Sequence, residues 1–400
     1  MSGRFAGVGV GPGDPELITL KAARLIGAAD VVAYHAGLGR QSHARRIAAD
    51  LIAPGAHEEQ LTYPVTTGAT DHPGGYTGAL AAFYEESADR LAAHLEAGRD
   101  VVLLSEGDPM FYGSYMYMHD RLAHRFATTI VPGVPAFLAA TATTAAPLVR
   151  QTDVLTVLPG TLPEPELARR LADTDGAVIM KLGRTFPAVR RALEAAGRLE
   201  HALYVERASM PAEHWTPVAE VDPAHVPYFS LIVVTGDSLH GRRSRDELDA
   251  GWAPSDDRPE APEVPAAAAG PAELLVVGVG PGPDRWTTPE VQEALAEVDH
   301  VVGYGPYLDR VPQRAGLRRH ASGNTVEVDR ARAALMLALK GERVAVVSGG
   351  DAGVFGMAAA VFEAAEDPVF ADVRVRVLPG VSAVQAVAAR AGAPIGRAHV

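Results

Sequence analysis

The residues with the clearest chemical potential in this 400-residue sequence are glycines and one carboxylate that follow an apolar run. Val101–Leu104 is predicted to be a short buried strand, and Ser105–Gly113 continues it as Ser-Glu-Gly-Asp-Pro-Met-Phe-Tyr-Gly. In open α/β sheets, ligands bind at the carboxyl ends of the strands, where this loop would lie. Strand-end carbonyl oxygens and the Asp108 carboxylate suit a positively charged ligand.

The same signal recurs later in the chain. Ser348–Gly356 matches Ser105–Gly113 at an offset of 243 residues, again after an apolar run. Gly278–Gly282 repeats Gly9–Gly13 at an offset of 269, so the first copy carries about 26 extra residues. A third turn, Val131–Ala136, recurs at an offset of 247 as Leu378–Ala383. Three turns repeated in order predict a duplicated unit rather than a short-period solenoid.

The first glycine turn invites comparison with the dinucleotide-binding fingerprint, Gly-x-Gly-x-x-Gly. Gly9-Val10-Gly11-Pro12-Gly13 has a different spacing, and Pro12 lacks the N–H that would bind a phosphate. Asp30 lies too early and Asp50 too late to serve as the acidic ribose partner. A dinucleotide site is therefore not favoured.

Composition excludes several other kinds of site. The sequence has no cysteine, which rules out disulfides and thiolate chemistry, and its early histidines lack a zinc-type His-x-x-x-His spacing, so no metal site is predicted. A net charge of −13 argues against nucleic-acid binding. Residues 128–149 are weakly polar but hold three prolines, so a strand, turn and helix is favoured over a membrane span. We expect a cytoplasmic protein.

The elements that would position these turns follow from hydrophobic periodicity. Strands alternate with helices over residues 1–150, which predicts a mainly parallel sheet. Strand candidates restart at Val154–Leu158, Gly176–Leu182, Ala202–Glu206 and Tyr228–Thr235, so residues 151–240 are predicted to form a second lobe. Residues 241–272 are rich in proline, alanine and charge and are predicted to be a flexible linker. The repeated unit occupies residues 273–400.

Taken together, Gly11–Thr19, Glu106–Pro109 and Val131–Val134 resemble the tetrapyrrole methylase family. The resemblance implies the class III S-adenosylmethionine methyltransferase fold, with the cofactor in the cleft between two α/β lobes. Residues 2–240 are similar to the precorrin-2 C-20 methyltransferases, which make precorrin-3A in cobalamin biosynthesis. Residues 272–400 are similar to the first lobe of the precorrin-3B C-17 methyltransferases. Without a second lobe that unit is expected to be inactive alone, and family members are commonly homodimers.

Carried over position by position, the resemblance implies two sets of cofactor contacts. In the first unit and its second lobe they are Pro12, Glu106, Gly107, Asp108, Phe111, Pro135, Ala136, Met180, Lys181, Thr235 and Gly236. In the repeated unit they are Pro281, Gly349, Gly350, Asp351, Val354, Ser382 and Ala383. Glu106 and Pro135 depart from the family pattern, which commonly has Gly and Thr or Ser at these positions.

The acceptor implied by the resemblance is a carbon of a reduced tetrapyrrole with many carboxylates. Lys181, Arg184, Arg40 and Arg207 are the candidates to bind those carboxylates by charge-assisted bonds. The acceptor carbon is electron-rich, so no nucleophilic side chain is needed. The sequence does not choose a proton acceptor among Tyr34, His35, Glu106 and Tyr112.

Two rival functions remain open from the sequence. One keeps the fold and changes the acceptor to diphthine or ribosomal RNA, although a basic surface for RNA is not evident. The other is a tetrapyrrole-binding scaffold that catalyses no reaction.

Overall fold

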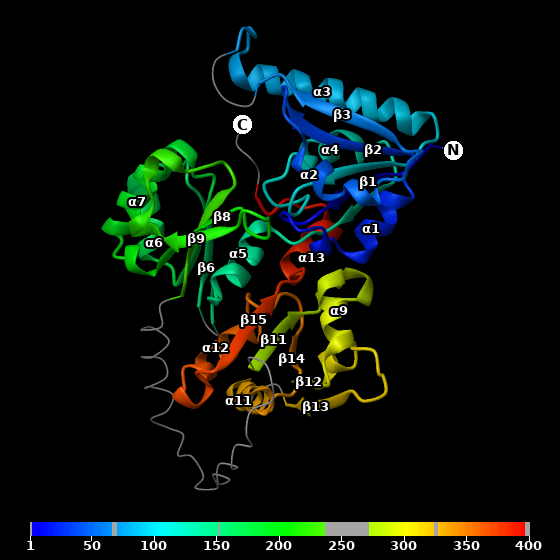
Figure 1. Ribbon diagram of the computed structural model, residues 1–400. Helices are drawn as coiled ribbons and strands as arrows, with labels where there is room; N and C mark the ends of the chain where they lie inside the picture. The colour runs from blue at the N-terminus through cyan, green and yellow to red at the C-terminus, as the bar shows by residue number, and fades with distance from the viewer. Residues whose placement is uncertain (1, 66–69, 151–152, 237–271, 324–326, 397–400) are drawn as a thin grey trace. The chain divides into compact units, whose positions relative to one another are not determined.

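The computed structural model describes residues 2–65, 70–150, 153–236, 272–323 and 327–396 (Figure 1). The chain divides into two compact units. The first contains residues 1–136, 279–292 and 380–400, and the second contains residues 137–278 and 293–379. Most of the predicted linker, residues 241–271, lies outside the described residues, and Ala272 opens a strand.

The first unit is built on a five-stranded sheet in which every pairing is parallel. Its order is β3 (His57–Tyr63), β2 (Val31–Gly37), β4 (Val101–Ser105), β1 (Phe5–Gly9) and β5 (Thr128–Val131). Helices α1 (Leu20–Gly27), α2 (His43–Ile47), α3 (Gly75–Glu96) and α4 (Tyr115–Leu122) complete this lobe.

Both faces of this sheet are buried, which explains its continuous apolar strands. Val101 and Leu103 belong to a core cluster with residues of α3 and α4. Val102 and Leu104 belong to a second cluster with residues of α1 and α2. The predicted parallel α/β lobe is confirmed.

Local capping sets the start of α1. The chain forms a 3-10 turn at Pro15–Leu17 and then α1. Thr19 separates them, because its side chain accepts a hydrogen bond from Ala22 N and starts a new helix. Strand β3 was not predicted, since its sequence is mostly polar and its outer positions are exposed.

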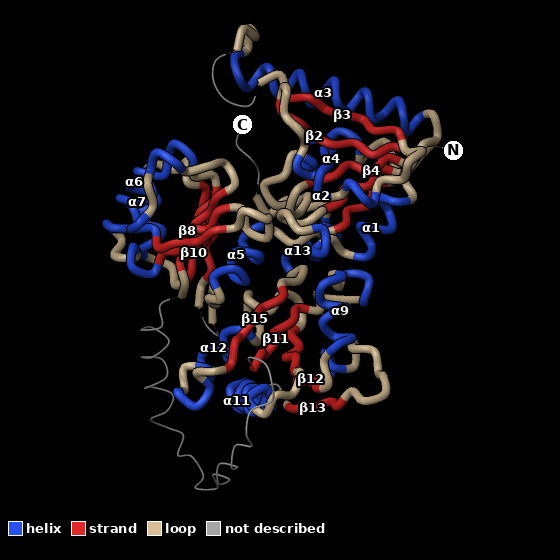
Figure 2. The backbone as a smooth tube through the Cα atoms, in the orientation of Figure 1, coloured by secondary structure: helices blue, strands red, loops and turns tan. Residues whose placement is uncertain are grey.

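The second sheet has the order β6 (Leu155–Pro159), β7 (Gly176–Met180), β10 (Ser230–Val234), β8 (Ala202–Glu206) and β9 (His214–Pro217). Only β6 and β7 are parallel, because β10 runs antiparallel to both β7 and β8. Figure 2 shows α6 (Glu164–Ala172) and α7 (Phe186–Ala195) packed together beside this sheet. The predicted strands are present, and the short exposed strand β9 was missed.

The third sheet repeats the strand order of the first. Its order is β13 (Arg318–Ser322), β12 (His300–Tyr304), β14 (Val344–Ser348), β11 (Ala272–Gly278) and β15 (Val373–Leu378), again all parallel. This agreement supports the duplication read from the sequence. Part of the extra length of the first copy is a longer helix, since α3 has 22 residues where α11 (Glu327–Leu339) has 13.

The remaining α-helices are α5 (Ala136–Thr144) of the first copy and α9 (Pro289–Glu297), α10 (Gly305–Leu308), α12 (Ala358–Ala365) and α13 (Ala383–Ala391) of the second. The other 3-10 turns are Ala49–Leu51, Gly183–Thr185, Leu199–His201, Val218–Glu220, Pro223–His225, Asp284–Trp286 and Pro368–Phe370. Among the described residues, no helix combines the length and apolar character that crossing a membrane requires.

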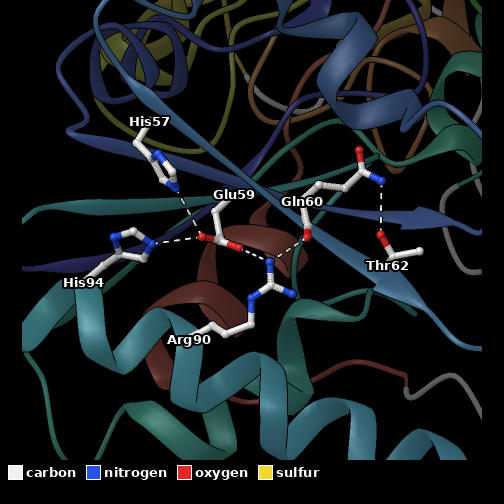
Figure 3. Close-up of polar contacts among 6 residues, drawn as sticks. All are labelled: His57, Glu59, Gln60, Thr62, Arg90 and His94. Atoms are coloured by element: carbon white, nitrogen blue, oxygen red, sulfur yellow. Dashed lines mark hydrogen bonds and ion pairs between the residues drawn. The ribbon is translucent and has the colours of Figure 1, made fainter.

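A partly buried polar cluster joins β3 to α3 in the first unit (Figure 3). The imidazoles of His57 and His94 both approach Oε2 of Glu59, at 3.3 and 3.0 Å, and the Arg90 guanidinium contacts Oε1. The ligand atoms of the histidines and Glu59 lie within 4.8 Å of one another, a spacing that also suits a metal ion. Because Arg90 already balances the carboxylate charge, we interpret the cluster as an ion-pair network.

This network predicts a pH-dependent contribution to stability. Burial raises the pKa of Glu59, but hydrogen bonds from His94 and His57 and the charge of Arg90 lower it below its usual value. The ionised form therefore stabilises the fold at neutral pH, and this stability is lost as the pH falls through the lowered pKa. We expect Glu59→Gln to cost about 1–3 kcal/mol of unfolding free energy at pH 7 and less near pH 4.

Chemical denaturation at both pH values measures this difference. Glu58→Gln is the matched control, because Glu58 forms a more exposed pair with Arg45 and should cost less than about 1 kcal/mol. Equal losses for the two variants at both pH values would contradict the role given to Glu59.

Candidate functional site

The carboxyl end of the first sheet brings three predicted turns together. Strand β1 lies between β4 and β5, so the turn after β1 is flanked by the other two. Gly107 N donates a hydrogen bond to Gly11 O at 2.8 Å, and Gly11 N donates to Gly107 O at 3.4 Å. The turns carry seven predicted cofactor contacts, namely Pro12, Glu106, Gly107, Asp108, Phe111, Pro135 and Ala136.

Asp108 ties two of these turns to each other. Its Oδ1 accepts a hydrogen bond from Met110 N at 2.8 Å, and its Oδ2 accepts one from Gly133 N at 3.0 Å. The side chain is only 1% exposed. Burial raises the pKa of Asp108 to about 7, although the two backbone donors favour its ionised form. The first role of Asp108 is therefore to hold the turn after β5 against the turn after β4.

Glycines permit this close approach of backbones. A Cβ on Gly9 would lie 2.6 Å from Gly133 N, and a Cβ on Gly133 would overlap the carbonyl oxygen of Gly107. Gly107 is different, because a Cβ there would lie 3.7 Å from Pro135 Cα, an ordinary contact. Its constraint is conformational, since its φ of +67° lies in the left-handed region.

Glu106 is an unusual carboxyl group beside these glycines. It is partly buried, and burial raises its pKa to about 8 even though the nearby Arg46 charge lowers it. It is therefore mostly neutral at pH 7. A cation placed beside it would favour the ionised form.

The structure separates the four candidate proton acceptors. Tyr34 is tied to Glu58 and Arg45 on the α2 side of the sheet. Tyr112 has a φ of +55° and its backbone N donates to Gly396 O at 2.9 Å. Burial lowers the pKa of His35 to about 4, so its imidazole is neutral at pH 7.

His35 is distinguished by one buried ring nitrogen. Its Nε2 is buried and has no hydrogen-bond partner among the described residues. The ring stacks on Tyr63 with a centroid distance of 5.3 Å, near the carboxyl end of β2. A pKa of about 4 makes this imidazole a weak base at pH 7, so it is the position of the buried nitrogen, and not its basicity, that marks His35 as a candidate proton acceptor. The sequence names His35 as a candidate, but only its burial distinguishes it.

The predicted substrate-binding cations have different surroundings. Arg40 is exposed in the loop before α2, and Arg184 is exposed in a 3-10 turn. Arg207 pairs with Glu206. Lys181 is partly buried at the end of β7, has a φ of +59°, and burial lowers its pKa. Arg207 shares the left-handed backbone, with a φ of +52°, so what distinguishes Lys181 is the burial that lowers its pKa.

The second lobe does not bring all of its predicted cofactor contacts together. Met180 is the last residue of β7, and Lys181 follows it at the carboxyl end. Strand β10 is antiparallel, so Thr235 and Gly236 lie near the amino end of β7, where Val234 pairs with Ala177. The two pairs of residues therefore lie at opposite edges of this sheet.

The edge that carries Lys181 has another feature that sequence reasoning did not select as a site. Residues 228 and 229 precede β10, and Arg207 N donates to Phe229 O at 2.9 Å. Tyr228 is 82% exposed and packs edge-on against Phe229. An exposed aromatic ring near basic side chains suits a flat, acidic ligand. Its exposure could not be read from the sequence.

The repeated unit has a similar turn after β14. Gly350 has a φ of +74°, like Gly107, and Asp351 is 1% exposed. Asp351 Oδ1 accepts hydrogen bonds from Gly353 N and Val354 N, at 2.8 and 3.0 Å. Gly349 stands in place of Glu106, and a Cβ there would meet the ring of Tyr307 at 2.6 Å. This turn therefore lacks the carboxyl group of the first.

The repeat has three further predicted cofactor contacts, Pro281, Ser382 and Ala383, and these belong to the first compact unit. The turn after β14 belongs to the second compact unit. The Ser382 side chain caps α13 by accepting a hydrogen bond from Val384 N at 3.2 Å. Pro135 stands at the equivalent position before α5 and cannot form this cap.

Comparison with known proteins gives one family and close relatives over most of the chain. The family described as Tetrapyrrole (Corrin/Porphyrin) Methylases matches residues 4–222 and 273–400. The Cobalamin biosynthesis protein CobIJ of Mycobacterium tuberculosis is 53% identical over 394 residues, covering 98% of this chain and 72% of that protein.

Each repeat also has a separate relative in Sinorhizobium sp. The Precorrin-2 C(20)-methyltransferase is 52% identical over 234 residues, 58% of this chain and 96% of that enzyme. The Precorrin-3B C(17)-methyltransferase is 50% identical over 125 residues, 31% of this chain and 49% of that enzyme.

The glycine contacts predict a ranking of substitutions in the turns. Gly107→Ala should cost about 1–2 kcal/mol of unfolding free energy, the penalty for a side chain in the left-handed region. Gly133→Ala should cost more, because its Cβ meets backbone that cannot move aside. Gly55→Ala is the control, since nothing lies within 4 Å of its Cβ. Urea unfolding measures the order, and a Gly133→Ala variant as stable as the control would contradict it.

Proposed function

This chain belongs to the tetrapyrrole methylase family, and we propose that residues 1–240 transfer a methyl group from S-adenosylmethionine to C-20 of precorrin-2. The observation that carries the proposal is the 52% identity to a Precorrin-2 C(20)-methyltransferase over 96% of that enzyme. Within this proposal, residues 273–400 are the first lobe of a C-17 methyltransferase unit. The proposal includes a cytoplasmic location and no nucleic-acid partner, in keeping with a net charge of −13.

The residues of the first unit fit such a cofactor. S-adenosylmethionine supplies a methyl group on a positively charged sulfur, which an in-line displacement transfers to a carbon nucleophile. The backbone of Gly107 and the carboxyl group of Glu106 would hold it, with Pro12 and Ala136 on the neighbouring turns. Glu106 would become ionised beside the sulfur charge, and Asp108 would keep the turns in register.

The protein's main contribution is alignment. Holding a donor and an acceptor in reactive geometry supplies on the order of 7–11 kcal/mol of the barrier. The glycine-lined turns are rigid because their backbones bond to each other and to Asp108. His35 would accept the proton that the acceptor carbon loses. Lys181 would bind a substrate carboxylate through a charge-assisted hydrogen bond.

A methyl-transfer assay tests this function directly. The chain is incubated with precorrin-2 and cofactor labelled on its methyl group, and the position of the label is read by NMR spectroscopy. We expect one labelled methyl group at C-20. In the same assay, His35→Gln should lower kcat by about 10²–10⁴-fold, the usual contribution of a general base. No transfer, or transfer to another carbon, would reject the proposed function; unchanged kcat would reject only His35.

The pKa of Glu106 predicts how cofactor affinity depends on pH. A sulfonium beside Glu106 favours its ionised form, so binding releases a proton while the free group is still protonated. Affinity for S-adenosylmethionine should therefore rise as the pH increases towards about 8, the pKa of free Glu106, and level off above it. S-adenosylhomocysteine has no sulfonium charge and should show a smaller slope.

Calorimetry from pH 6 to 9 measures both slopes. Glu106→Gln should remove the difference between the two ligands and leave the fold intact. A difference that survives in this variant would assign the coupling to Asp108 instead. Identical slopes for both ligands in the native chain would contradict a carboxylate beside the sulfur.

A further inference from the structure

The end of the second repeat, residues 395 and 396, is hydrogen-bonded to the loop after β4 in the first repeat, residues 110–112. In the first unit, Phe111 forms a parallel β-bridge with Gly396. Tyr112 N donates to Gly396 O at 2.9 Å, and Ile395 N donates to Met110 O at 2.9 Å. Because Met110 N also donates to Asp108 Oδ1, this contact reaches the centre of the proposed cofactor site.

Helix α13, which precedes this segment, packs into the same lobe (Figure 1). It contacts β5, and Ala388 belongs to the hydrophobic core that contains Met110 and Tyr115. Gly392, at the end of α13, has so little room that a Cβ would lie 3.0 Å from His119 Nε2. The segment is thus part of the core of the first lobe rather than a surface attachment.

The second compact unit contains the corresponding contact. Here the second repeat supplies the loop, and the first repeat supplies the segment that covers it. Val149 of the first repeat forms a parallel β-bridge with Val354 of the second. Helix α5, which precedes Val149, places Thr141 next to Gly353, where a Cβ would lie 2.9 Å from its Oγ1. Ala142 packs against the core of the third sheet.

The two bridges are equivalent positions of the duplication. The offset of 243 residues relates Phe111 to Val354, and the offset of 247 relates Val149 to Gly396. The residue after each loop position has the same left-handed backbone, with φ of +55° at Tyr112 and +53° at Phe355. A contact in which each partner uses the same two surfaces is the mark of two-fold pairing.

We propose that the two repeats of one chain pair with each other by this reciprocal contact. The α13 segment of the second repeat covers the loop after β4, and the α5 segment of the first repeat covers the loop after β14. The second repeat is then a structural partner of the first and holds its loop from Asp108 to Tyr112. A surface that two separate chains would share is satisfied within one chain, so we expect a monomer instead of the homodimer that the resemblance implies.

Hydrogen–deuterium exchange tests the coupling without depending on catalysis. Ala388 is 6% exposed on α13, whereas its neighbour Val387 is 65% exposed. Ala388→Asp should increase exchange at least tenfold in peptides covering residues 108–113, with β7 unchanged. Val387→Asp is the matched control and should leave both regions unchanged. Equal protection of residues 108–113 in the two variants would overturn the proposal.

Cross-linking tests whether the contact lies within one chain. The sequence has no cysteine, so Val149→Cys with Val354→Cys introduces a single pair. Bridge partners lie within the Cα separation that a disulfide requires. Oxidation should link this pair within a chain of 41.9 kDa, as read by intact mass and peptide mapping. Links between chains, or thiols that stay free, would reject pairing within the chain.

Discussion

The close packing of three backbone turns is the constraint on which the rest of the first unit depends. Gly9, Gly107 and Gly133 approach one another so closely that two of them have no space for a Cβ, and Asp108 bonds across the gap. A buried carboxyl group with two backbone donors is satisfied only while the turns keep this arrangement. The sheet, its helices and the bound end of the repeat all maintain that geometry.

The repeated unit keeps this constraint but changes the chemistry around it. Asp351 is as buried as Asp108, and Gly350 has the same left-handed conformation as Gly107. The position of Glu106 is a glycine, and an aromatic ring packs where its side chain would begin. The backbone geometry is therefore common to both repeats, whereas the carboxyl group of high pKa belongs to one.

The sequence predicts the parts of the molecule that depend on short-range pattern. The glycine turns, the parallel sheets and the duplication follow from local motifs and fixed offsets, and the structure agrees with them. The antiparallel course of β10 depends on packing between distant segments, so the opposite placement of Lys181 and Thr235 could not be foreseen. The His57, Glu59 and His94 cluster was missed for the same reason, because β3 and α3 bring its members together.

The two reciprocal contacts use different residue pairs, as contacts between unlike repeats can. On one side a bulky Phe111 meets Gly396, and on the other Val354 meets Val149. A Cβ at Gly396 would lie 2.8 Å from the Tyr112 ring, so this position has no room for the valine of its counterpart. A pair of identical subunits must use one combination of residues on both sides. Linking the repeats raises their effective concentration and allows each contact to adopt its own combination.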